Sequence, residues 1–224
     1  MALRGTAFVA IWHGVQAGAE ADYLNWHTHE HMPERLGVPG FLQGRRYVDW
    51  SLQLHPSFTL YEGAHIETFR SPGYLARLND PTPWSNDVQP KMTSFLRGGC
   101  ETLLSFGKGV GGAITTIRLM APENGKAFEK KLSALAVEFS SATGVTSVHV
   151  ARHVSQATGG ETAETRMRPS VSGDAFSHVV LIEGIAPRLL GKAHKNIEQS
   201  LRSIEAGNVF IASYPLDFAL RAPE

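Results

Sequence analysis

The stretch that decides the fold is FLQGRRYVDW, residues 41–50, followed after a short gap by SFTLYEGAHI, residues 57–66. Both segments are rich in aromatic and β-branched residues, which favour strands. The other elements expected in the first half are a strand at 6–12, a helical segment at about 18–36, a helix from Pro72 with Ser71 as its cap, a helical stretch at about 84–95 and a strand at 100–107. The predicted order of the first half is therefore βαββαβ.

The second half repeats this order. Its expected elements are a strand at 112–120, a helix at 125–142, strands at 145–154 and 177–185, a helix at 187–204 and a strand at 208–220. Tyr61-Glu62-Gly63 in the first half also corresponds to Ile182-Glu183-Gly184 in the second. We therefore predict two ferredoxin-like halves, residues 1–108 and 109–224, joined at the glycine-rich run 107–112. A polar segment at about 155–176 has no counterpart in the first half and is expected to be a surface loop.

Each βαββαβ half predicts an antiparallel sheet with both helices on one face. The second face of each sheet would leave apolar side chains bare, which is unfavourable in water. Two such sheets remove this exposure by packing face to face. The predicted fold class is therefore α+β, with tandem duplicated ferredoxin-like βαββαβ units whose antiparallel sheets pack as an α+β barrel.

The charge balance speaks against partners that bind by electrostatic attraction. Lys plus Arg and Asp plus Glu are both 21, and the formal net charge at pH 7 is zero, so we expect neither nucleic acid nor a membrane as partner. A small-molecule ligand is expected instead, and a homodimer is left open. The single cysteine, Cys100, excludes an intramolecular disulfide and is expected to be buried in a strand. No window is apolar enough for a membrane helix, and we expect a cytoplasmic protein.

The residues that suggest chemistry lie in DYLNWHTHEHMPERL, residues 22–36, where three histidines fall at alternate positions. On a helix with about 100° per residue, His27 and Glu30 share one face and His31 lies beside it. His29 lies on nearly the opposite side and is expected to face solvent. The three histidines therefore form a pair and an outlier rather than one cluster.

Pro33 interrupts this helix, because proline lacks the amide hydrogen and clashes with the preceding turn. We expect the helix to kink or end near Met32. The corresponding helix of the second half, residues 126–142, carries an ordinary apolar stripe with no histidine and no tryptophan. The fold alone therefore does not require the histidines of the first half.

Several hypotheses fit this helix. His27, Glu30 and His31 could form a catalytic proton-transfer group in a pocket between the helix and the sheet, because histidine titrates near neutral pH and a carboxylate can fix its tautomer. His27 and His31 could instead bind a metal with a third ligand from elsewhere. The candidates for that ligand are Glu62, His65 and His178. The run also matches H-x-x-E-H, a zinc protease pattern, and a polar helix face without chemistry is the remaining interpretation. The proton-transfer group is our prediction, with no metal and no cofactor.

Four further residues are predicted to line the substrate site: Tyr23, Trp26, Arg46 and Trp84. Arg45 and Arg46 are adjacent in a strand, so their side chains point to opposite faces. The inward one would suit a carboxylate substrate, although a salt bridge to Glu30 or Glu34 is the simpler interpretation. For Trp84 the simpler interpretation is packing of a loop against the sheet.

The motifs W-H-x-x-E-H-x-P-E-R-L, from Trp26 to Leu36, and G-F-x-x-x-R-R-Y, from Gly40 to Tyr47, resemble those of the dimeric α+β barrel superfamily. The chain looks most similar to EthD-like bacterial proteins of unknown function. The resemblance covers the first half by motif and the second half by architecture. It implies ferredoxin-like folds that pair through their sheets, and relatives that include cofactor-free monooxygenases, isomerases and haem proteins.

We therefore expect a small-molecule enzyme that acts on an apolar or aromatic compound by His/Glu acid-base chemistry, of the cofactor-independent oxygenase or isomerase type. The alternatives are a non-catalytic ligand-binding or assembly module and a metal- or haem-binding protein.

Overall fold

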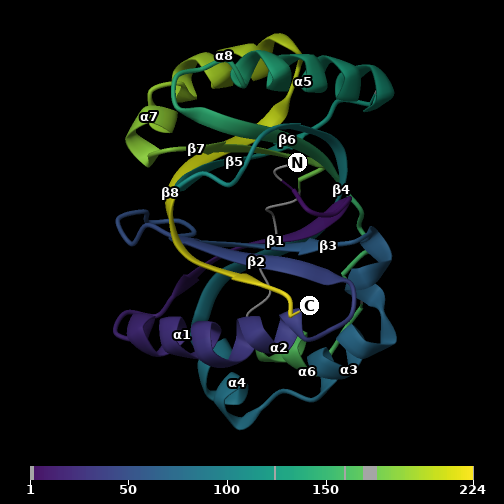
Figure 1. Cartoon of the computed structure of the whole chain (residues 1–224), viewed down its shortest axis with the longest axis vertical. Helices are drawn as coiled ribbons and strands as arrows, with labels where there is room; N and C mark the ends of the chain where they lie inside the picture. Colours follow the sequence, from purple (N-terminus) through teal and green to yellow (C-terminus); the bar gives the residue numbers. More distant parts are fainter. Residues whose placement is uncertain (1–2, 124, 159, 169–175, 224) are drawn as a thin grey trace. The chain divides into compact units, whose positions relative to one another are not determined.

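The computed structural model describes residues 3–123, 125–158, 160–168 and 176–223 (Figure 1). Their strands form one hydrogen-bonded series, β1-β3-β2-β8-β5-β7-β6-β4, which closes into a barrel. The predicted α+β barrel is confirmed. Among the described residues, the N-terminal unit contains 4–99, 155–158, 160–168 and 217–223, and the C-terminal unit contains 3, 100–123, 125–154 and 176–216. The division of the sequence into halves at residues 108 and 109 stays a prediction.

The N-terminal unit has the predicted βαββαβ order. Its elements are β1 (Ala7–Val15), α1 (Glu20–Trp26), a π-helical turn (His27–His31), α2 (Met32–Leu36), β2 (Phe41–Val48), β3 (Ser57–Gly63), a 3-10 turn (Ile66–Arg70), α3 (Pro72–Asn79), α4 (Pro83–Val88), a 3-10 turn (Gln89–Lys91) and the first part of β4 (Met92–Gly107). β1 and β2 both pair with β3 in antiparallel register. Figure 1 shows α1 and α2 running along one face of β1 and β2. This face holds the site described below.

The C-terminal unit repeats the order. Its elements are the rest of β4, β5 (Ala113–Met120), α5 (Gly125–Phe139), β6 (Val145–His153), β7 (His178–Gly184), α7 (Pro187–Gly191), α8 (His194–Ser203) and most of β8 (Gly207–Arg221). β5 and β6 both pair with β7, as β1 and β2 pair with β3. α5 and α8 lie side by side over this sheet (Figure 1). The internal duplication expected from the sequence is therefore present in the strand pairing.

A buried glutamate occupies the same place in each unit. Glu62 in β3 pairs with Arg45 of β2 at 2.8 Å, and Glu183 in β7 accepts a hydrogen bond from His149 of β6 at 3.3 Å. Each glutamate also accepts a backbone N–H from the chain just before the first strand of its unit, at 2.6 and 3.0 Å. A buried carboxylate must be satisfied in this way. The repeated Glu-Gly pair of the sequence thus marks one structural position used twice.

The segment from Glu20 to Leu36 is helical throughout and contains a π-helical turn. The N–H of Met32 donates to the carbonyl of His27, five residues earlier. On an α-helix, side chains five residues apart point roughly 140° away from each other, yet the rings of Trp26 and His31 lie 4.2 Å apart. The extra residue in the turn therefore brings His31 onto the face that Trp26 shares. Such turns are frequent at functional sites.

Pro33 lies in the first turn of α2. Because the chain before it is already helical, its missing N–H leaves one helical hydrogen bond unmade. The helix was expected to kink or end near Met32, and there the π-helical turn ends and α2 begins.

Two predicted helices have different bounds. The helical stretch expected at 84–95 ends at Lys91, and β4 begins at Met92, well before the predicted start at Cys100. Met92 and Phe95 have helical spacing, but the backbone between them turns at Ser94, where φ is 47°. The helix expected at 187–204 is two helices, α7 and α8.

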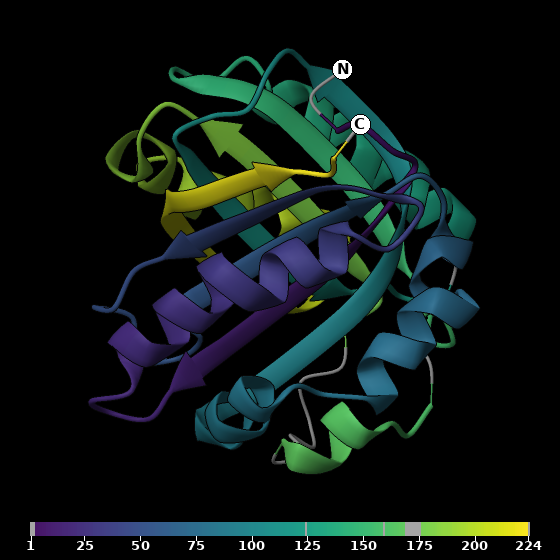
Figure 2. The ribbon, with the colours of Figure 1, turned by 60° about the horizontal axis from the view of Figure 1, so that its bottom comes forward.

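The polar segment after β6 was expected to be a surface loop, but its described part packs against the N-terminal unit. It contains α6 (Ala163–Met167), whose first turn is closed by hydrogen bonds between Thr162 and Thr165. α6, green in Figures 1 and 2, contacts α3. Glu164 is buried. Residues 159 and 169–175 lie outside the described residues.

Two smaller predictions can be assessed directly. Cys100 is buried in β4, as predicted, and burial raises the pKa of its thiol. His29 is exposed, also as predicted. Among the helices that the structure describes, none is long and apolar enough to cross a membrane.

Candidate functional site

A small cavity lies in the N-terminal unit beside the π-helical turn. Its volume is about 20 Å³, which is enough for one water-sized guest. The residues that line it are Ile11, His13, Trp26, His27, His31, Thr59, Tyr61, Met92, Phe95 and Arg168. Three histidines, a tyrosine and an arginine thus surround one space with apolar walls.

Both ring nitrogens of His27 are occupied. A guanidinium nitrogen of Arg46 lies 3.1 Å from Nδ1, and the hydroxyl of Tyr61 lies 3.1 Å from Nε2. A guanidinium can only donate, so Nδ1 is the acceptor and Nε2 carries the hydrogen that it donates to Tyr61. The Tyr61 hydroxyl therefore keeps its own hydrogen for another acceptor.

Arg46 is fixed behind His27 and does not line the cavity. It donates to Asp217 at 2.7 Å, to the hydroxyl of Thr28 at 2.9 Å and to the carbonyl of Leu24 at 3.2 Å. Burial, together with the charge of Arg46, holds the pKa of His27 well below its usual range. His27 therefore stays neutral, and its place in the network is to orient the Tyr61 hydroxyl.

His31 differs from His27 in having an unused nitrogen. The residue is only 7% exposed, and its Nδ1 is buried with no hydrogen-bond partner among the described residues. Burial and then the charge of Arg35 hold the pKa of His31 well below its usual range. The ring is kept in place by Trp26 and lies 5.7 Å from the His27 ring. A neutral imidazole with a free nitrogen beside a cavity has the properties of a proton acceptor.

His13 and Tyr23 form a second neutral network. Nδ1 of His13 lies 2.9 Å from the carbonyl of Gly14, so it donates there, and Nε2 accepts from the Tyr23 hydroxyl at 3.0 Å. Tyr23 in turn contacts the hydroxyl of Ser57 at 3.1 Å. Burial lowers the pKa of His13 to about 4. Tyr23 contacts His13 and is not among the residues that line the cavity; its predicted contact with substrate stays a prediction.

The structure separates Glu30 from the two histidines. Its carboxylate accepts hydrogen bonds from the hydroxyls of Thr82 and Ser85, at the start of α4, and the cavity lining does not include it. Ser85 also accepts a hydrogen bond from Nε1 of Trp26 at 3.1 Å. Glu30 thus connects the first helix to α4. Of the three predicted acid-base residues, His27 and His31 line the cavity and Glu30 does not; their catalytic role stays a prediction.

The two predicted tryptophans have different places. Trp26 lines the cavity, whereas Trp84 belongs to α4, donates to Asp22 of α1 at 3.1 Å and packs in a cluster with Val88. Trp84 therefore packs from a helix against α1, and not from a loop against the sheet as expected.

The ion pairs of the adjacent residues Arg45 and Arg46 also differ from those expected. Arg45 pairs with Glu62 and Arg46 with Asp217, rather than either with Glu30 or Glu34. Both partners are remote in sequence, so strand alternation alone could not identify them.

Sequence reasoning missed four cavity residues that carry polar groups: His13, Thr59, Tyr61 and Arg168. Three of these residues, His13, Thr59 and Tyr61, lie on strands. They could have been found by comparing the two units, because the strands of both units pair in the same register. His13 pairs with Ser57 in β1–β3, and the corresponding position in β5–β7 is Leu119, which pairs with His178.

By the same registers, Thr59 corresponds to Val180 and Tyr61 to Ile182. Leu119, Val180 and Ile182 all belong to the apolar core of the C-terminal unit. One copy of the fold is therefore apolar at the positions where the other copy carries a histidine, a threonine and a tyrosine. This difference indicates that the polar set is not needed for folding.

Arg168 follows α6 and reaches the cavity from a segment that the first half of the sequence lacks. It donates to Glu164 at 2.8 Å, and its guanidinium lies 4.2 Å from the centre of the Phe95 ring. Glu164 also pairs with Arg35. Arg168 could not be placed from sequence, because its position depends on the docking of α6.

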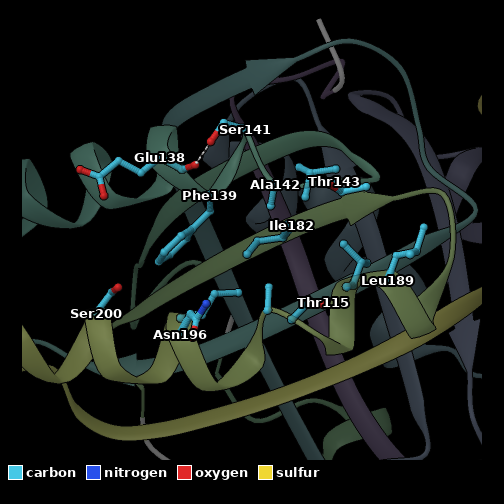
Figure 3. A pocket seen from close by; sticks show the side chains of 14 residues that line it. Thr115, Glu138, Phe139, Ser141, Ala142, Thr143, Ile182, Leu189, Asn196 and Ser200 are labelled. Carbon is cyan, nitrogen blue, oxygen red and sulfur yellow. Dashed lines mark hydrogen bonds between the residues drawn. The ribbon is translucent and has the colours of Figure 1, made fainter.

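The C-terminal unit contains a larger pocket, of about 260 Å³. Phe139, Ile182 and Leu189 point into it, and Asn196 and Ser200 lie at its α8 side (Figure 3). Its titratable lining residue is Glu138, which is exposed. This pocket is suited to an apolar ligand, but the groups needed for acid-base chemistry line the smaller cavity.

The described residues do not suit a bound metal ion or haem. Among them, no group of three or more His, Cys, Asp or Glu side chains could hold a metal ion. A porphyrin does not fit a cavity of about 20 Å³ beside His31.

Several solved structures match this chain over nearly its full length. An anthrone oxidase-like protein is 10% identical, with a TM-score of 0.66 over 100% of this chain and 97% of that one. A "putative monooxygenase" from Fusobacterium nucleatum subsp. nucleatum is 13% identical, with a TM-score of 0.60 over 98% and 96%. This chain has the dimeric α+β barrel fold. A "putative chlorite dismutase" also matches, at 9% identity and a TM-score of 0.53 over 95% of both chains.

At these identities the likeness concerns the fold alone. No family model matches the chain, and no curated protein does. The closer similarity to EthD-like proteins stays a prediction.

Proposed function

We propose that this protein is a small-molecule enzyme of the oxygenase or isomerase type, which removes a proton from an apolar or aromatic substrate whose reacting group enters the N-terminal cavity. The observation that carries the proposal is the buried, unpartnered Nδ1 of His31 beside a tyrosine hydroxyl whose hydrogen is free to be donated. A base and a hydrogen-bond donor that line one cavity are the minimum for abstracting a proton next to a carbonyl or from a hydroxyl.

In this mechanism His31 is the general base. Its lowered pKa keeps the ring in the neutral form that can accept a proton at neutral pH. Tyr61 donates its hydrogen to the substrate oxygen on which negative charge develops. Burial holds the pKa of Tyr61 well above its usual range, so the hydroxyl stays protonated and acts as a donor rather than a base. A fixed donor aimed at developing charge is a large source of rate enhancement in enzymes.

His27 acts through Tyr61 and is a positioning residue. Arg46 fixes the tautomer of His27, and His27 fixes the direction in which the Tyr61 hydroxyl can donate. The substrate anion formed by proton removal then has two outcomes. A proton returned at a different atom gives an isomerase, and reaction of the anion with dioxygen gives an oxygenase. The names of the structures with this fold, an anthrone oxidase-like protein and a monooxygenase, favour the second outcome.

The test is deuterium exchange. The purified protein is incubated in D₂O with a panel of enolisable aryl ketones and hydroxyarenes, and deuterium incorporation is followed by NMR. The proposal predicts faster exchange with at least one compound than in protein-free buffer, abolished in H31Q. Oxygen uptake with the same compound separates the oxygenase from the isomerase. Exchange that is equal with and without protein across the panel would contradict the proposal.

A second candidate is a ligand-binding module, which is favoured by the larger apolar pocket of the C-terminal unit. Saturable binding of an apolar fluorescent probe that is lost in I182N and kept in H31Q would support this function instead.

A further inference from the structure

Arg168 has a hydrogen-bond donor that no described residue uses. Its side chain is 7% exposed, one terminal nitrogen donates to Glu164, and the guanidinium stacks on Phe95. Nε is buried and has no hydrogen-bond partner among the described residues. A buried guanidinium N–H normally finds an acceptor, because its desolvation is costly. The unpaired Nε–H of Arg168 therefore suggests that a ligand supplies the missing acceptor.

The charge around Arg168 is also incompletely balanced. The single carboxylate of Glu164 is shared between Arg168 and Arg35, and both arginine side chains are buried. The charge of Arg97 acts on Arg168 as well, and the hydrogen bond that Arg97 makes goes to the neutral carbonyl of Thr158. Burial, with these two neighbouring guanidiniums, lowers the pKa of Arg168 to about 10, so it remains charged at neutral pH. An incompletely compensated buried cation is unfavourable unless an anion joins it.

Glu34 reduces this imbalance but does not remove it. It pairs with Arg35 at 3.4 Å, so that two carboxylates, those of Glu34 and Glu164, face three guanidiniums, those of Arg35, Arg97 and Arg168. Asp217 is engaged by Arg46. Positive charge is therefore left at the wall that Arg168 contributes.

His31 lines the same cavity as Arg168 and also has an unused nitrogen. Ile11, Met92 and Phe95 add apolar side chains to the lining of this cavity. The volume of about 20 Å³ limits an occupant in this conformation to a few atoms. Once His31 has accepted a proton, His31 and Arg168 are two charged hydrogen-bond donors that line one small cavity.

We propose that this cavity is a binding site for a small anionic group, held between Arg168 and His31. The inference rests on the proposed function, since the natural occupant would be the anionic group that the substrate acquires when His31 removes its proton. Arg168 would thereby favour substrates whose conjugate base carries its charge on one compact group. A free inorganic anion of similar size should occupy the site together with a proton taken up by His31, so its binding should strengthen as the pH falls.

The test is calorimetric titration at constant ionic strength with fluoride, azide, formate and benzoate. The wild-type protein should bind at least one of the three small ions with one-to-one stoichiometry. Benzoate distinguishes the source of the group: its binding shows that the anionic end of a larger molecule can enter, and its failure restricts the site to free small ions. No binding by any of the four ions overturns the inference.

Two variants make the result specific. R168K keeps a charge beside Glu164 but removes the Nε–H, and it should bind the same ion about ten- to a hundredfold more weakly, as expected for loss of a charge-assisted hydrogen bond. R166Q alters an exposed arginine of the same short helix, one that pairs with Glu161, and should bind as the wild type does. Equal affinity of R168K and wild type overturns the inference.

The two proposals fail separately. Anion binding that depends on Arg168 without deuterium exchange keeps the anion site and removes the proposed reaction. Deuterium exchange that depends on His31, without anion binding, keeps the proposed reaction and removes the anion site.

Discussion

The hydroxyl of Tyr61 lies 3.1 Å from Nε2 of His27, and the other nitrogen of that ring accepts a hydrogen bond from Arg46. The direction of both bonds follows from the arginine, which can only donate. Tyr61 therefore receives one hydrogen bond and has one to give. In the C-terminal unit the corresponding residue is Ile182, where no such relay exists.

Replacing Tyr61 by phenylalanine should remove the donor and leave the Nε2–H of His27 buried without an acceptor. We expect unfolding free energy to fall by about 1–3 kcal/mol and deuterium exchange to be lost, measured by urea denaturation and NMR. Y74F is the control, because the Tyr74 ring packs in the same core cluster as Tyr61 but does not line the cavity. Normal exchange in Y61F would exclude Tyr61 as the donor.

Stability should fall in mild acid because of three buried histidines. His13, His27 and His31 have folded pKa values below the ordinary value of 6.5. Below pH 6.5 the unfolded chain therefore binds protons that the folded chain does not, so the contribution is present above this pH and is lost as the pH falls toward the folded pKa values. Each histidine should contribute a slope of about 1.4 kcal/mol per pH unit.

Urea unfolding between pH 7.5 and 5 measures this slope. H31Q should reduce it by about one histidine's share, whereas H29Q should leave it unchanged because His29 is exposed. An identical slope in wild type and H31Q would mean that His31 is not kept neutral by the fold.

Glu30 should matter for stability and not for chemistry. In E30A the hydroxyls of Thr82 and Ser85 lose their shared acceptor, and unfolding free energy should fall by about 1 kcal/mol. The rate of deuterium exchange should remain that of the wild type. A large loss of exchange with unchanged stability would restore Glu30 to the catalytic group.

Substitution of Glu164 should destabilise the N-terminal unit more than substitution of most other residues. E164Q removes the carboxylate shared by two buried arginines, and breaking such a network typically destabilises a protein by about 3–5 kcal/mol. E161Q, at an exposed residue just before the same helix, should change stability by less than about 0.5 kcal/mol. Equal effects of the two substitutions would show that α6 is not held by Glu164.

The sequence allowed the order of elements and the barrel to be predicted, because periodicity and the repeat are local signals. It also placed His27 and His31 correctly on an inward face and His29 outside. Glu30 was assigned to the histidines because an ideal α-helix was assumed. The π-helical turn shifts the faces by one residue, so that His31 stacks on Trp26 while Glu30 contacts α4.

The remaining site residues depend on contacts between distant segments. In the repeated triplets of the sequence, Tyr61 corresponds to Ile182. A search for positions that are polar in one half and apolar in the other would have identified Tyr61. His13 needed the strand register as well. Arg168 lies in a polar segment, and a buried arginine there becomes evident only when α6 is seen to dock beside α3.

The most direct measurement is the rate of deuterium exchange into an accepted substrate by H31Q and H29Q, a matched pair of substitutions two residues apart on one helix. If His31 is the base, H31Q should exchange at the protein-free rate while folding normally, and H29Q should exchange as the wild type does. Equal rates in H31Q and wild type would contradict the assignment of His31 and with it the proposed reaction at this cavity.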